Sequence, residues 1–114
     1  MLSLFVRGGT KGNNQPTVAT AVASSSIIAL RGYGWGAIRF NADPGTVTVY
    51  ARCGDDDTWA IAKKSDKNGG ADLTFTPGAT QPMPLDDDIF YYNEIKLVAT
   101  NVIVAANCHL SLKC

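Results

Sequence analysis

The sequence predicts an all-β fold: a single antiparallel β-sandwich or jelly roll of about eight strands. Short stretches in which apolar and polar residues alternate recur along the chain, and clusters of turn-forming residues separate them at regular spacing. No stretch shows a convincing helical period. The length of 114 residues is enough for one domain and too short for two.

The clearest element lies in residues 46–64, which we expect to form a hairpin. Val47, Val49 and Ala51 alternate with polar residues, which is typical of a strand with one buried face. A Gly-Asp-Asp-Asp run at 54–57 then favours a turn, because Gly and Asp tolerate turn dihedrals. Trp59 and Ile61 restart the alternation on the returning strand.

The chain divides into an arm, residues 1–16, and a sandwich domain, residues 17–114. Residues 2–6 are apolar enough to add an edge strand, and residues 8–16 have the composition of a flexible loop. Residues 17–30 are ambiguous: Pro16 could start a helix, but their β-branched and serine-rich composition favours two short strands.

The remaining elements follow from turn signals. Residues 32–36 predict a bend with aromatic side chains at a sheet end, residues 37–40 a strand, and residues 41–45 a turn. Further strands are expected at 71–76, 94–99 and 102–112, and Pro82 and Pro84 restrict the segment between the first two of these to an edge or loop. Residues 102–112 are apolar at both odd and even positions, so both faces of a strand there would be apolar. This indicates a central strand or one covered by a neighbouring subunit.

Composition argues against several functional classes. Ten Lys and Arg balance ten Asp and Glu, whereas a protein devoted to nucleic acid normally carries a basic excess. No apolar run approaches the roughly 20 residues that span a bilayer. The three cysteines leave at least one thiol free, which is unusual for a disulfide-built secreted domain. We therefore expect cytosolic synthesis, or a mature fragment whose leader is missing.

The sequence predicts no enzyme, no cofactor and no metal. His109 is the only histidine, and on a strand it would face away from Cys108, so the two could not pair. The aspartates at 55–57 and 86–88 are consecutive and lack the spacing of a calcium loop, which favours solvated turns. The second cluster could also form ion pairs with a partner.

Aromatic side chains are the best candidates for a binding surface. Tyr33, Trp35, Trp59 and the 90–92 run could stack on sugars or bases. Roles in the core and at a subunit interface are favoured over stacking.

The motifs that begin and end the strands, and their order along the chain, resemble those of small β-sandwich virion proteins of tailed bacteriophages. A serine-rich strand at 24–33 ends in Leu-Arg-Gly-Tyr, and an Asp-Asp-Asp-Thr-Trp hairpin follows. A late Tyr-x-x-Ile-Lys-Leu strand precedes a final Val-rich one. The chain departs from the family pattern at Asp57, where the family hairpin has glycine.

The resemblance implies a capsid decoration (cement) protein, or a related head or tail component, often trimeric and bound to the major capsid protein. Such a protein is made in the host cytoplasm and located on the capsid surface of the virion. We expect it to self-associate about a symmetry axis. The expected interface residues are Leu2, Leu4, Phe5, Arg7, Tyr33, Trp35, Phe90, Tyr91 and Tyr92.

Two alternatives from other classes remain open. One is a carbohydrate-binding module that uses Tyr33, Trp35 and Tyr91. The other is a calcium-dependent adhesion domain in which Asp56 and Asp87 bind the ion.

Overall fold

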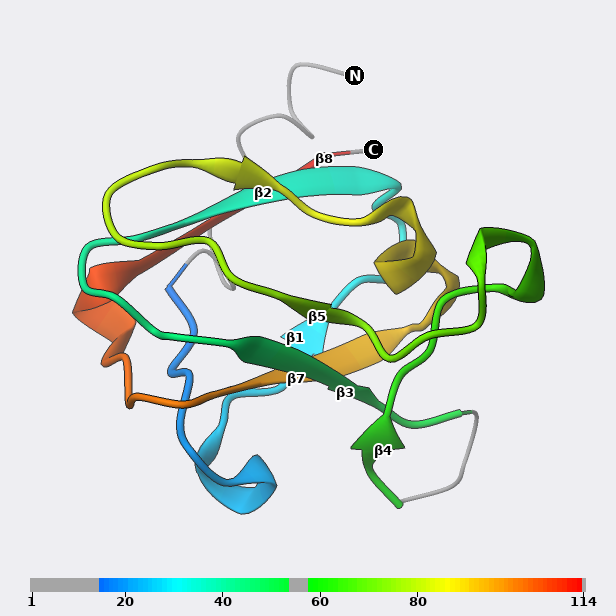
Figure 1. Ribbon diagram of the computed structural model, residues 1–114, viewed down its shortest axis with the longest axis horizontal. Coiled ribbons are helices and arrows are strands. Elements are labelled where there is room, and N and C mark those ends of the chain that lie inside the picture. The colour runs from blue at the N-terminus through cyan, green and yellow to red at the C-terminus, as the bar shows by residue number, and fades with distance from the viewer. Residues whose placement is uncertain (1–14, 54–57, 114) are drawn as a thin grey trace.

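A computed structural model describes residues 15–53 and 58–113 of the chain. They form two antiparallel sheets packed face to face, with β2 and β8 in the upper layer and β3 and β7 in the lower layer of Figure 1. The predicted all-β sandwich is confirmed. The strands are β1 (Ile28–Ala29), β2 (Trp35–Phe40), β3 (Val47–Ala51), β4 (Ala60–Ile61), β5 (Thr74–Phe75), β6 (Met83–Pro84), β7 (Glu94–Ala99) and β8 (Cys108–Lys113).

The larger sheet has the strand order β1-β7-β3-β4, with β5 also paired to β3, and the smaller sheet has the order β6-β2-β8. The long pairings are β3 with β7 and β2 with β8, and each joins segments far apart in the sequence. Four short 3₁₀ helices connect the strands: η1 (Val22–Ser24), η2 (Asp66–Asn68), η3 (Asp87–Tyr91) and η4 (Ala105–Asn107).

The predicted hairpin is present, with one detail changed. In β3 the residues Val47, Val49 and Ala51 are buried, as the alternation predicts, and β3 pairs with β4. On the returning strand Ile61 is exposed, and Ala62, one residue later, is buried. Ile61 lies opposite Tyr50, its register partner, and therefore on the face of the sheet that points away from the buried residues of β3.

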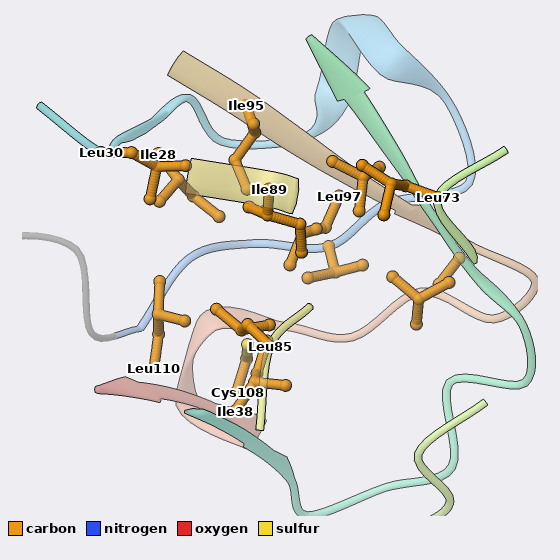
Figure 2. Packing of buried hydrophobic residues seen from close by; sticks show 14 of the residues in the cluster. Ile28, Leu30, Ile38, Leu73, Leu85, Ile89, Ile95, Leu97, Cys108 and Leu110 are labelled. Carbon is orange, nitrogen blue, oxygen red and sulfur yellow. The ribbon is translucent and has the colours of Figure 1, made fainter. Parts of the chain in front are cut away.

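The core lies between the two sheets and contains side chains from both. Figure 2 shows Ile38, Cys108 and Leu110 from the smaller sheet directed toward the space into which Ile95 and Leu97 project from β7. Burying apolar surface in this way is the main stabilising contribution to the fold. Ile28, Leu30, Leu73, Leu85 and Ile89 extend the same cluster beyond the long strands.

Residues 17–30 combine short extended pieces with one 3₁₀ turn. Val18 bridges Ile103, Ala19 bridges Val98, and only Ile28–Ala29 forms a regular strand. Between them η1 takes the place of a second strand, because the hydroxyl of Ser25 hydrogen-bonds the backbone of Ala19 and Ala21 and tightens the chain.

The prediction of one strand over residues 102–112 is wrong in its extent, and of the two expected positions the central one is wrong. The regular strand begins at Cys108, after η4, and β8 lies at an edge of its sheet. Val102 and Val104 are exposed, while Ile103 between them is buried through its bridge to Val18. Apolar residues occur at both odd and even positions because residues 102–107 form a connection between the two sheets, and the regular strand starts only after it.

Candidate interaction surface

The outward side of the smaller sheet is the best candidate for a functional surface. Side chains in β2 and β8 alternate between the core and solvent, and the register places outward residues opposite one another: Trp35 with Lys113, Ala37 with Ser111, and Arg39 with His109. We call these six residues the β2–β8 face. Trp35 is 58% exposed, which is high for an indole side chain.

Two shallow hollows run along this face. The first, of about 360 Å³, is lined by Arg39, Pro82 and His109, and the second, of about 310 Å³, by Trp35, Pro84, Asp87 and Lys113. Ala37 and Ser111 line both, so the hollows adjoin over the two smallest side chains of the face. Small residues in the middle and large ones at both ends make the face concave along the strands.

The charges on this face are mostly positive. Arg39 and Lys113 are exposed, and the carboxylate of Asp87 lies at the rim of the second hollow. Nε2 of His109 lies 3.1 Å from the side-chain amide nitrogen of Asn41, in a hydrogen bond in which the ring nitrogen accepts when the amide donates. The face therefore offers cationic donors and one aromatic ring to a partner.

The aromatic residues predicted at the interface divide into two groups. Trp35 and Tyr91 are exposed, at 58% and 77%. Tyr33, Phe90 and Tyr92 are half-buried against the core, and the hydroxyl of Tyr92 donates to the carbonyl of Lys63 at 3.1 Å. Leu2, Leu4, Phe5 and Arg7 lie outside the described residues.

The outward side of the larger sheet has a different character. The guanidinium of Arg52 lies 4.7 Å and the ammonium of Lys96 5.0 Å from the centroid of the Trp59 ring, which is cation–π geometry. Arg52 also pairs with Glu94 at 2.6 Å. Two cations lie over the indole ring of Trp59, which makes this ring less available for stacking on a ligand.

The expectation that residues 86–88 form a solvated turn is wrong for Asp88. Its side chain is buried and accepts hydrogen bonds from the Ser65 amide and the Asn68 side chain, which ties η3 to the loop around η2. Asp86 caps η3 by accepting from the Asp88 amide, as N-cap aspartates do. Residues 55–57 of the other aspartate cluster lie outside the described residues.

The two described cysteines and the histidine differ in their exposure and in the side of the sheet that they face. Cys53 is exposed and Cys108 is buried, and both are free thiols. Burial raises the pKa of the Cys108 thiol to about 12. His109 points to the opposite side of β8 from Cys108, as expected.

Within residues 15–53 and 58–113, no group of three or more His, Cys, Asp and Glu side chains is placed to hold a metal ion. The same residues include no helix long and apolar enough to cross a membrane.

Sequence reasoning identified Trp35 but missed Arg39, Ser111 and Lys113 as its neighbours. Alternation within each strand was a sufficient signal for which residues point outward. The antiparallel register of β2 and β8, which brings residues about 70 positions apart into one row, has no local signal in the sequence.

The structure thus defines an all-β protein of two packed antiparallel sheets with an open, concave face on the smaller one. No protein-family model, no curated protein and no solved structure matches the chain.

Proposed function

We propose that this chain is a structural virion protein of a tailed bacteriophage, a capsid decoration (cement) protein that binds the major capsid protein and stabilises the head. The observation that carries the proposal is the open β2–β8 face, with exposed Trp35 at one end and Arg39 at the other. The resemblance of the motifs at the strand ends to those of phage virion proteins suggests the class of partner, a major capsid protein.

The shape of the face favours a protein partner over a small molecule. Pockets for small ligands enclose most of the ligand surface, whereas both hollows on the β2–β8 face are shallow and lie along strands. Protein interfaces bury about 800 Å² on each partner and are enriched in Trp, Tyr and Arg. Trp35 and Arg39 fit that composition and flank small residues that let a partner approach closely.

The proposal includes a homotrimer on the outer surface of the capsid. Three copies about a symmetry axis would present three β2–β8 faces to the shell. Simultaneous binding of the three faces would raise the overall affinity above that of one face, which is avidity. Binding of this kind uses protein contacts alone, without nucleic acid, membrane, cofactor or catalysis.

The test is co-sedimentation of the purified chain with empty capsids, together with size-exclusion chromatography and light scattering. We expect saturable binding by the unaltered chain and a loss of at least tenfold in affinity for Trp35→Ala or Arg39→Glu, equivalent to about 1.4 kcal/mol or more. Ile61→Ser, which removes an exposed apolar side chain from the other sheet, is the matched control and should bind normally. Equal binding by all variants would contradict the role of the face, and no binding by the unaltered chain would contradict the function.

The exposure of Trp35 also favours a second candidate, a carbohydrate-binding module. Sugars stack on exposed indole rings, and the second hollow beside Trp35 offers Lys113 and Asp87 as hydrogen-bonding groups. Binding on a glycan array that is lost in Trp35→Ala, without any capsid binding, would support this candidate over the first.

A further inference from the structure

β8 is the longest strand at a sheet edge within the part of the chain that the structure describes. It has six residues, Cys108–Lys113, whereas the other edge strands β1, β4, β5 and β6 have two each. β6 also contains Pro84, which has no amide to donate to a further strand. Long, unprotected edges pair with additional strands, and proteins normally cover or interrupt them.

The register shows which backbone groups of β8 point away from β2. The amide of Asn41 donates to the carbonyl of Asn107 at 2.8 Å, so these two residues form a hydrogen-bonded pair at the start of the ladder. In an antiparallel ladder such pairs alternate with non-bonded ones. His109, Ser111 and Lys113 therefore bond to β2, and the backbone groups of the even-numbered residues of β8 point to the outer edge.

Most of these outward groups have no partner among the described residues. The amide of Cys108 donates to the carbonyl of Ala105, which ends η4. The amides and carbonyls of Leu110 and Leu112 make no hydrogen bond within residues 15–53 and 58–113. Both leucines are nearly buried, at 3% and 1% exposure. Because the backbone groups of buried residues are almost always paired, we expect a further strand at this edge beyond those that the described residues form.

We propose that residues 2–6 of this chain add to the outer edge of β8 as its missing neighbour. Leu2, Leu4 and Val6 alternate with Ser3 and Phe5, the same period-two pattern as Leu110, Ser111 and Leu112 in β8. Paired in this register, the first set covers the open side of the core and the second set extends the β2–β8 face. A five-residue strand spans about 16 Å, close to the length of the open edge.

Residues 2–6 can reach the outer edge of β8 from the point at which the described chain begins. Val18 is bridged to Ile103, so the chain enters the fold beside the connection that leads into β8. Eight residues lie between Val6 and Gln15, and an extended chain over these nine steps reaches about 30 Å. The edge accepts the segment either from its own molecule or from a neighbouring copy, and the inference does not depend on the proposed capsid partner.

Amide hydrogen exchange of the full-length, nitrogen-15-labelled chain, measured residue by residue, tests the proposal. With the strand added, the amides of Leu110 and Leu112 should exchange within about tenfold of the rate of Ser111, which bonds to β2. Leu4→Pro removes an amide and disrupts the added strand. It should accelerate exchange at Leu110 and Leu112 by at least about 100-fold while Ser111 stays protected, which also shows that the fold is intact.

Asn13→Pro is the matched control, because it places the same substitution in the arm outside the pairing segment, and it should leave the Leu110 and Leu112 amides protected. Fast exchange of both leucine amides in the unaltered chain would overturn the proposal, as would unchanged protection in Leu4→Pro. Light scattering of the same samples then shows whether the strand comes from the same molecule (monomer) or from a neighbour (oligomer).

Discussion

The buried carboxylate of Asp88 accepts a hydrogen bond of 3.0 Å from the side-chain amide of Asn68, twenty residues earlier in the chain. The same oxygen accepts from the backbone amide of Ser65. Together these bonds hold η3, which carries the exposed Tyr91, against the loop around η2. The position of this part of the surface therefore depends on one acidic side chain inside the protein.

Asp88→Ala should lower the free energy of unfolding by about 1–3 kcal/mol, because it leaves two donors without an acceptor. Urea denaturation monitored by tryptophan fluorescence measures the change. Asp87→Ala, at the adjacent exposed position, should change it by no more than about 0.5 kcal/mol. Equal effects of the two substitutions would show that Asp88 has no special structural role.

Gly36→Ala should destabilise the smaller sheet by about 1–3 kcal/mol, since overpacking forces neighbouring atoms apart. A Cβ at Gly36 would lie 2.6 Å from the carbonyl oxygen of Ser111 in the adjacent strand, and backbone cannot move away easily. Gly34→Ala is the control, because a Cβ there meets nothing within 4 Å. Thermal unfolding should give a lower midpoint for the first variant alone, and equal midpoints would contradict the close approach.

Thr80→Asn should stabilise the protein by about 0.5–1 kcal/mol. Thr80 has φ of 65°, a left-handed conformation that is strained for a β-branched residue and tolerated better by Asn. The substitution retains the amide that donates to the carbonyl of Phe40 at 2.6 Å. Thr76→Asn, at an exposed position with negative φ, should give no gain in the same denaturation experiment.

Stability should fall between pH 9 and pH 12 through the Cys108 thiol. Burial raises its pKa from 9.0 to about 12, because the folded protein disfavours the thiolate. Above pH 9 the unfolded chain loses this proton while the folded chain keeps it, so the stability contribution present below pH 9 declines by about 1.4 kcal/mol per pH unit. Cys108→Ala should remove that part of the slope, and identical slopes in both proteins would contradict the shift.

Much of the fold could be predicted from local patterns. Alternation in residues 47–51 predicted a strand with one buried face, and turn signals predicted another strand at 94–99. Prolines at 82 and 84 restricted the segment around them to an edge or a loop, because a missing amide is a local property. The boundary of the last strand was not predictable in the same way. Val102, Ile103 and Val104 are all apolar, as in a buried strand, but within the described residues only Ile103 is paired, through a single bridge to Val18.

The candidate surface separates most clearly what the local sequence determined from what the tertiary structure decided. The sequence by itself determined that Trp35 is an aromatic residue at a sheet end and that His109 faces away from Cys108. Only the tertiary structure decided that Arg39 and His109 share a row, and that Leu110 and Leu112 in β8 have backbone groups without a partner among the described residues. The reason is that alternation assigns each side chain to a face of its own strand, whereas pairing between distant strands depends on how both sheets bury the common core.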